Sequence, residues 1–314
     1  MDWVSLRRLR ARFLEGKPGE DYWRNSEALE SYNRTFAERI GWKWDAVLAE
    51  LKLRGWTPPG ESVLDWGCGT GVAGRRVIGT WPEQLKQLQL WDRSGSAVDF
   101  ALRQARSQFS TIEVKKATAS PAIDLLVVSH VINELAPAAL DQLLQVAARC
   151  AAVLWVEPGT QADSRALIAV REKLLSQFHV VAPCTHQLAC PLLQPENAAH
   201  WCHHFATPPG EVFTDGDWAR FAKTMEIDLG TVPFSFLVLD KRPVAETDAS
   251  RVIGVPRPYK GFDKVLSCQA DGVRDLMVQK RDAPELLKEF KKDPGSLYRW
   301  RRDGDKILGG ERIF

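Results

Sequence analysis

Short apolar runs alternate with amphipathic windows through the first half of the chain, and this alternation restricts the possible folds more than any other feature of the sequence. Strands that are buried on both faces read as continuous apolar runs, and the helices that join parallel strands cover the faces of the sheet. The pattern therefore predicts an α/β fold with a doubly wound parallel sheet. The apolar runs lie at 62–66, 88–91, 123–131 and 152–156, and the helical windows lie at 72–78, 96–108 and 140–148.

A glycine-rich turn follows the first predicted strand. The segment Val63–Gly71 reads VLDWGCGTG, and its glycines allow a tight turn in which backbone N–H groups approach a ligand closely. The G-x-G-x-G spacing differs from the dinucleotide pattern G-x-G-x-x-G and resembles the first motif of class I S-adenosylmethionine-dependent methyltransferases. Asp92 ends the second apolar run, where an acid accepts hydrogen bonds from ribose hydroxyls. The predicted cofactor-binding residues are Asp65, Gly67, Gly69, Gly71 and Asp92.

A second group of polar residues follows the apolar run 123–131. In an open α/β sheet the ligand crevice lies beyond the carboxyl ends of the strands, so His130, Asn133 and Glu134 are expected to line it, with Asn133 and Glu134 as candidate catalytic residues. A structural alternative carries equal weight, in which Glu134 caps the next helix and His130 packs in the core. No Asn-Pro-Pro-Tyr run and no Pro-Cys pair occurs at this strand end, so the residues do not identify the methylated atom.

Four of the six cysteines fall outside the alternating region. Cys184, Cys190 and Cys202 are spaced C-x5-C-x11-C in an irregular stretch at 181–209, and Cys268 follows after 65 further residues. Four thiolates hold either zinc or an iron–sulfur cluster, and these gaps are wider than the usual zinc knuckles, which favours a cluster. A mixed Cys/His zinc site stays open, because histidines crowd the same stretch at 186, 200, 203 and 204.

Charge and composition divide the chain into three segments. The net charge is +2, with both ends basic and the middle acidic, and a basic flank attracts a phosphate backbone. No apolar run approaches the roughly 18 residues of a membrane-spanning helix, and residues 1–14 lack the apolar core of a secretory signal. We expect an N-terminal helical segment (1–55), an α/β domain (56–240) with a Cys-rich insertion (181–209), and a basic, β-rich C-terminal segment (241–314).

The combination of the glycine turn and the cysteine stretch resembles the Rsm22 family, methyltransferase-like proteins linked to the small ribosomal subunit, and the similarity runs across most of the chain. The resemblance implies a class I methyltransferase fold, a [4Fe-4S] cluster and association with small-subunit rRNA. By motif, the cluster ligands are Cys184, Cys190, Cys202 and Cys268. The segments that carry the resemblance are 22–51, 63–71, 133–135, 157–160, 182–191, 201–203, 234–236 and 251–268.

The leading hypothesis is therefore a protein that binds S-adenosylmethionine and an iron–sulfur cluster, and that acts on small-subunit rRNA in ribosome assembly or translation. Whether it transfers a methyl group stays open. The alternatives are a non-catalytic rRNA-binding assembly factor and a zinc-stapled small-molecule methyltransferase. We expect a monomer without membrane association in a bacterial cytoplasm or, alternatively, in the mitochondrial matrix. Phosphate and base contacts are expected from C-terminal residues, namely Arg251, Arg257, Lys260, Lys264, Arg274, Lys280, Arg281, Arg299, Arg301 and Arg302 with Tyr259, Tyr298 and Trp300.

Overall fold

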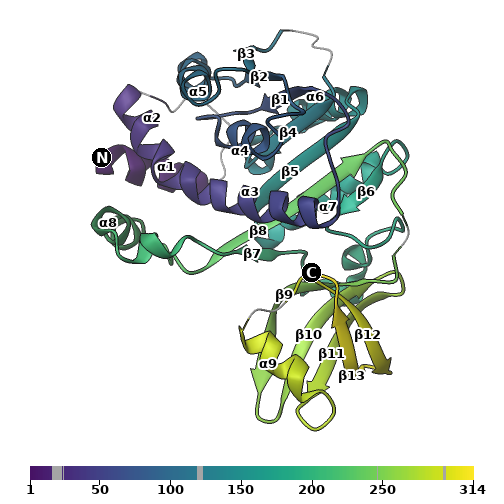
Figure 1. The fold of residues 1–314 in the computed structure, drawn as a ribbon. Coiled ribbons are helices and arrows are strands. Elements are labelled where there is room, and N and C mark those ends of the chain that lie inside the picture. The colour runs from purple at the N-terminus through teal and green to yellow at the C-terminus, as the bar shows by residue number, and fades with distance from the viewer. Residues whose placement is uncertain (16–22, 24, 119–122, 246, 293–294) are drawn as a thin grey trace. The chain divides into compact units, whose positions relative to one another are not determined.

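The computed structural model describes residues 1–15, 23, 25–118, 123–245, 247–292 and 295–314; Tyr22, the first residue of the segment 22–51 that carries part of the family resemblance, lies outside them. The chain forms two compact units (Figure 1). Unit 1 comprises Met1–Pro158 and Ala206–Phe234, and unit 2 comprises Gly159–Phe205 and Ser235–Phe314. The domain boundaries expected after residues 55 and 240 stay a prediction.

Unit 1 is built on a parallel sheet. Its strands follow the order β3-β2-β1-β4-β5, and every neighbouring pair is parallel. The central strands are apolar because both of their faces are covered, and Leu125 through Val128 of β4 are fully buried. The predicted doubly wound α/β fold is confirmed. The strands are β1 (Ser62–Trp66), β2 (Gln87–Trp91), β3 (Glu113–Lys116), β4 (Leu125–Ser129) and β5 (Ala152–Pro158).

Helices cover this sheet, and further helices precede its first strand in the chain. The helix α4 packs on β1, β2 and β4, while α3 packs on α4. The predicted N-terminal helical segment is present, but it is interrupted between α2 and α3 at Arg34 and Thr35. The helices of unit 1 are α1 (Trp3–Glu15), α2 (Ser26–Asn33), α3 (Phe36–Leu53), α4 (Val72–Thr80), α5 (Gly95–Gln108), α6 (Pro137–Arg149) and α8 (Gly216–Met225), with short 3₁₀ turns at Ile132–Glu134 and Gly210–Phe213.

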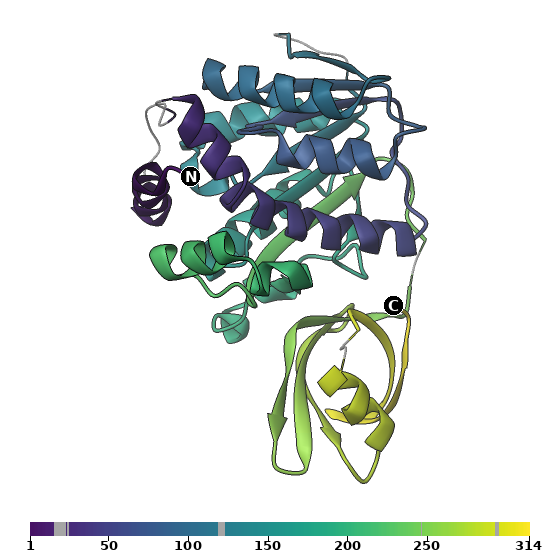
Figure 2. The same ribbon diagram turned by 60° about the vertical axis from the view of Figure 1, so that its left-hand side comes forward.

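Unit 2 combines a strand pair with a closed barrel. Strand β6 (His179–Ala182) pairs with the end of β8 (Val232–Asp240) in antiparallel register, and β7 (His204–Ala206) also pairs with β8. The barrel closes in the order β10-β11-β13-β12-β9, and Figure 2 shows its strands curling around an interior beside α9. The remaining elements are α7 (Gln161–Leu174), 3₁₀ turns at Pro191–Leu193 and Pro195–Asn197, β9 (Ser250–Tyr259), β10 (Phe262–Gln269), β11 (Gly272–Gln279), α9 (Pro284–Lys292), β12 (Leu297–Asp303) and β13 (Lys306–Arg312).

No helix among the described residues combines the length and the apolarity that crossing a bilayer would require.

Candidate cofactor cavity and cysteine cluster

The glycine turn after β1 depends on backbone angles that only glycine adopts without strain. Gly67, Gly69 and Gly71 all have positive φ, at 71°, 51° and 78°. A Cβ at Gly67 would lie 2.7 Å from a Val131 methyl carbon, whereas a Cβ at Gly69 would meet no protein atom within 4 Å. The turn is thus closed on one side by the end of β4 and open at Gly69.

Asp92 lies against this turn. One of its carboxylate oxygens accepts a hydrogen bond from the Gly69 N–H at 2.9 Å, and the other accepts from the Ser94 N–H at 2.9 Å. The N–H groups of Gly67 and Cys68 both donate to the carbonyl of Trp91. The ends of β1 and β2 are therefore joined through backbone and carboxylate contacts, and the predicted residues Gly69 and Asp92 face one space.

Asp65 has a different role from that of Asp92. It is completely buried, and one oxygen accepts a hydrogen bond from the Gly74 N–H at 2.9 Å. A Cβ at residue 74 would lie 2.8 Å from that oxygen, so Gly74 permits the contact. Burial raises the pKa of Asp65 to about 7, and the Gly74 hydrogen bond partly opposes this effect. Asp65 therefore fixes the start of α4 beneath the turn.

The end of β4 carries the two predicted catalytic candidates and a histidine. His130 has a left-handed backbone with φ of 55°, which is uncommon for a residue other than glycine. Lys43 Nζ donates to His130 Nε2 at 2.9 Å, and burial together with this ammonium lowers the pKa of His130. Glu134 pairs with Arg93 at 2.9 Å, and burial raises the pKa of Glu134. Asn133 lies beside them on the lining of the cavity.

Glu157, at the end of β5, organises this strand end from within the core. Its Oε1 accepts hydrogen bonds from the backbone N–H groups of Val131 and Ile132 and from the indole of Trp155. The side chain is completely buried. Glu157 thus holds the segment that follows β4 in position and does not face the cavity.

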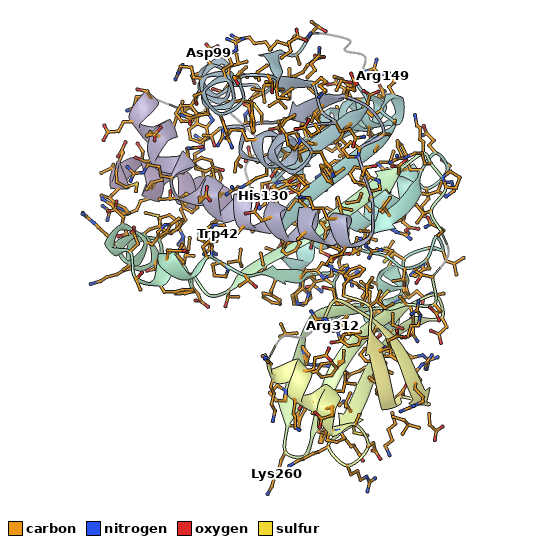
Figure 3. The ribbon with its side chains drawn as sticks, in the orientation of Figure 1. Trp42, Asp99, His130, Arg149, Lys260 and Arg312 are labelled. Carbon is orange, nitrogen blue, oxygen red and sulfur yellow. The ribbon has the colours of Figure 1, made fainter. Side chains whose placement is uncertain are left out.

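These strand ends surround a cavity of about 500 Å³, within the range of small-molecule sites. Residues that sequence reasoning did not assign form much of its wall, because helices α1 to α3 reach it through long-range packing. Trp66 and Trp91 stack at its edge with ring centroids 4.4 Å apart. Figure 3 shows His130 beside α3. The wall residues missed in the sequence include Phe13, Trp23, Tyr32, Phe36, Arg39, Ile40 and Lys43.

In unit 2 the four predicted thiol ligands gather in one region. Cys184, Cys190 and Cys202 line a small cavity of about 30 Å³. Cys268 of β10 and Cys190 belong to one apolar cluster, against which Cys202 packs. Cys202 Sγ lies 3.6 Å from His204 Nε2, and Cys268 Sγ lies 3.9 Å from the ring of His186. Burial, and then the neighbouring thiols, raise the pKa values of Cys190, Cys202 and Cys268.

Buried cationic and polar groups surround these thiols. Arg171 is only 2% exposed, and its guanidinium donates to the carbonyls of His186 and Leu188. Arg251 is 3% exposed and contacts His204 Nδ1 at 3.2 Å. Within the described part of the chain, Arg171 Nε, Thr185 Oγ1 and His186 Nδ1 are buried without a hydrogen bond.

Across the ranges that the structure describes, no group of three or more His, Cys, Asp or Glu side chains is arranged to hold a metal ion. Four thiols next to two buried arginines nevertheless fit an anionic thiolate-bound centre chemically.

The sequence matches the model of one protein family. The model of a family described as mitochondrial small ribosomal subunit Rsm22 matches residues 37–305. A search of curated proteins finds no match.

Solved structures align with this chain at low identity and with low TM-scores. A magnesium protoporphyrin IX methyltransferase from Synechocystis with bound S-adenosylmethionine is 12% identical, with a TM-score of 0.42, 77% of this chain covered and 98% of that chain. A SAM-dependent methyltransferase from Aquifex aeolicus is 16% identical, with a TM-score of 0.40, 52% of this chain covered and 93% of that chain. The predicted doubly wound parallel sheet and the β-rich C-terminal segment are both present in the structure.

Proposed function

Because the chain belongs to the Rsm22 family of methyltransferase-like proteins, we propose that it binds S-adenosylmethionine in the unit 1 cavity and acts on the RNA of the small ribosomal subunit. The observation that carries the cofactor assignment is the turn of left-handed glycines at Gly67, Gly69 and Gly71, together with the contact between Asp92 and the Gly69 N–H. The open side of Gly69 faces a cavity of suitable volume. No Cβ blocks the approach of a ligand to the backbone there.

Each end of the cavity suits a different part of this cofactor. Asp92, at the end of β2, is the residue that we assign to the ribose hydroxyls. The glycine turn, supported from below by Asp65, receives the amino acid end. S-adenosylmethionine supplies an electrophilic methyl group when it is bound. Asn133 and Glu134 lie at the β4 end of the same cavity, and they are the groups that we assign to orienting an acceptor.

The proposal places the protein with the small ribosomal subunit, in assembly or translation. The family description supports this assignment, and it favours the mitochondrial matrix among the two expected locations. The basic C-terminal segment supports contact with a phosphate backbone.

We also assign a [4Fe-4S] cluster to Cys184, Cys190, Cys202 and Cys268. Their convergence on one region of unit 2 and the two buried arginines beside them support this assignment. A cluster held by four thiolates is anionic, and Arg171 and Arg251 supply compensating positive charge. The cluster would join the irregular stretch 181–209 to the barrel as a structural staple, since metal binding of this kind contributes folding free energy.

A second candidate function is RNA binding without methyl transfer. Two polar side chains at the β4 end are already engaged, His130 with Lys43 and Glu134 with Arg93. A general base that is held in such contacts is less available to a substrate. This candidate keeps the cofactor site as a structural or regulatory element.

The decisive experiment combines four measurements, of which calorimetry and metal analysis are made on anaerobically purified full-length protein. Titration calorimetry with S-adenosylmethionine tests the cofactor site, and the absence of binding would contradict it. Metal and sulfide analysis tests the cluster, and zinc without iron would favour the zinc-stapled alternative. Sequencing of RNA crosslinked to the protein in its host tests the partner. Transfer of a labelled methyl group to small-subunit RNA then separates the enzyme from the non-catalytic factor.

A further inference from the structure

The C-terminal barrel has the connectivity of an OB-fold. Its first strand, β9, pairs with β10 and β12, its third strand β11 pairs in parallel with its fifth strand β13, and α9 connects the third and fourth strands. In this architecture the outer face of the second and third strands binds oligonucleotides or oligosaccharides, together with the turns that follow the first and fourth strands. Here those elements are β10, β11 and the turns at 260–261 and 304–305.

One half of that face is covered by the cysteine stretch. Leu266 and Cys268 of β10 and Val273 of β11 pack against Cys190 and Leu192. A ligand therefore has access only to the other half, toward the β9–β10 turn.

The accessible half carries an aromatic platform. Tyr259 ends β9 and Phe262 begins β10, and the two residues are direct partners in the strand register. Their rings stack with centroids 4.9 Å apart and an interplanar angle of 5°, and Tyr259 is 51% exposed. A flat, half-exposed aromatic surface suits the stacking of an unpaired base, which every base offers regardless of sequence.

Cations surround this platform. Lys260 lies in the two-residue β9–β10 turn, and Figure 3 shows it at the tip of the barrel. Lys280 and Arg281 line a shallow hollow with Lys260 and Phe262. On the neighbouring positions of the same face, Arg257 and Lys264 share the single carboxylate of Asp275. Positive charge exceeds negative charge here, which favours a phosphodiester over a neutral sugar chain.

We propose that this surface, centred on Tyr259 and Phe262, binds single-stranded RNA. A base stacks on the exposed face of Tyr259, while Lys260, Lys280 and Arg281 contact the phosphates. A duplex is excluded from the stacking contact because its bases are already stacked and paired. The inference rests on the proposed function only for the identity of the polymer as RNA.

The structure also corrects the expectation from the sequence that all of the C-terminal aromatic and basic residues contact RNA. Tyr298 is completely buried in the barrel core and stacks on Trp300 at 4.3 Å, and the Trp300 indole donates to Ser267. Arg251 is buried beside the cysteines. Tyr298 and Arg251 do not offer a surface to RNA, because their side chains are buried inside unit 2, whereas Trp300 is partly buried.

The test uses the full-length protein and a labelled, unstructured RNA of about 12 nucleotides, within the site size of an OB-fold. Fluorescence anisotropy is measured with the single strand and with its duplex. Tyr259→Ala is expected to weaken single-strand binding by about tenfold, and Tyr259→Trp to restore it. Lys260→Ala is expected to lower the slope of log affinity against log salt by about 0.7, the value for one phosphate contact on a single strand.

Lys288→Ala is the matched control, since it removes one exposed lysine from α9 outside this surface. Its affinity and salt slope should equal those of the wild type. Unchanged single-strand affinity in Tyr259→Ala, or duplex binding as tight as single-strand binding, overturns the assignment of this surface. If those variants still crosslink to small-subunit RNA like the wild type, the assignment of this surface is wrong while the proposed function stands. If the wild type binds the oligonucleotide through this surface but no small-subunit RNA, the proposed function fails instead.

Discussion

The Asp92 carboxylate accepts a hydrogen bond from the Gly69 N–H at 2.9 Å, and this contact joins the carboxyl ends of two adjacent parallel strands. The same carboxylate also holds the Ser94 N–H at the start of α5. Asp92 is therefore fixed in orientation before any ligand binds. A preoriented carboxylate loses little conformational freedom when it accepts hydrogen bonds from a ribose.

Asp92→Asn should weaken the binding of S-adenosylmethionine by about tenfold or more, because a hydrogen bond to a charged acceptor contributes about 1.5–3 kcal/mol. The amide oxygen can still accept from Gly69, so the turn should stay folded. Titration calorimetry measures the affinity. Asp99→Asn on α5 is the matched control, since Asp99 pairs with Lys116 on the exposed surface. Equal affinities in both variants would remove Asp92 from the site.

A comparison of Gly69→Ala with Gly55→Ala should separate an effect on cofactor affinity from an effect on the free energy of unfolding. Residue 69 has a φ of 51° and residue 55 a φ of 67°, and an added Cβ meets no protein atom within 4 Å at either position. Both alanine variants should therefore lose a similar free energy of unfolding, about 1–2 kcal/mol for a left-handed residue. Only Gly69→Ala should also lose cofactor affinity, because its methyl group enters the cavity. Denaturant unfolding and calorimetry on both variants check this, and equal affinity losses would show that the backbone strain alone is responsible.

The sequence predicted the elements whose pattern is local. Strands β1, β2, β4 and β5 were recognisable because both faces are buried, which leaves continuous apolar runs. Strand β3 was missed, since at the sheet edge its sequence Glu-Val-Lys-Lys buries only Val114. The walls of the cavity were also missed, because residues such as Tyr32 and Lys43 reach it only through the packing of distant helices.

The second half of the barrel shows why some strands escape sequence analysis. Strand β12 reads Leu-Tyr-Arg-Trp-Arg-Arg-Asp, and its charges mask the buried Leu297 and Tyr298 and the partly buried Trp300. Strand β13 contains Gly309 and Gly310, which normally argue against a strand. A Cβ at Gly310 would lie 2.7 Å from the Trp300 ring, and one at Gly309 would lie 2.5 Å from the Arg301 guanidinium. The rigid Trp300 ring on β12 thus favours glycine at residue 310, and this need is visible only in three dimensions.

Cys268→Ser should lower the iron content and the visible absorbance of the reconstituted protein, since one of the four assigned ligands is lost. Limited proteolysis should also cleave the C-terminal segment faster, because Cys268 lies on β10 and its partners lie at 184–202. Cys150→Ser is the matched control, as Cys150 is buried at the end of α6 and lies outside the cysteine cluster. Retained colour and unchanged protease resistance in Cys268→Ser would argue against the cluster.

Asp65→Asn should flatten the pH dependence of stability. Burial raises the pKa of Asp65 in the folded state to about 7, whereas its ordinary value is 3.8. Between these values the folded state keeps a proton that the unfolded state has released, so the contribution of Asp65 is fully present below about pH 4 and is lost as the pH rises through 7. The slope amounts to at most about 1.4 kcal/mol per pH unit. The free energy of unfolding, measured by denaturant titration from pH 5 to pH 8, should therefore fall more steeply in the wild type than in Asp65→Asn. Parallel curves for the two proteins would mean that the carboxyl is already ionised in the folded state, and its position beneath the glycine turn would then need a buried positive charge that compensates it.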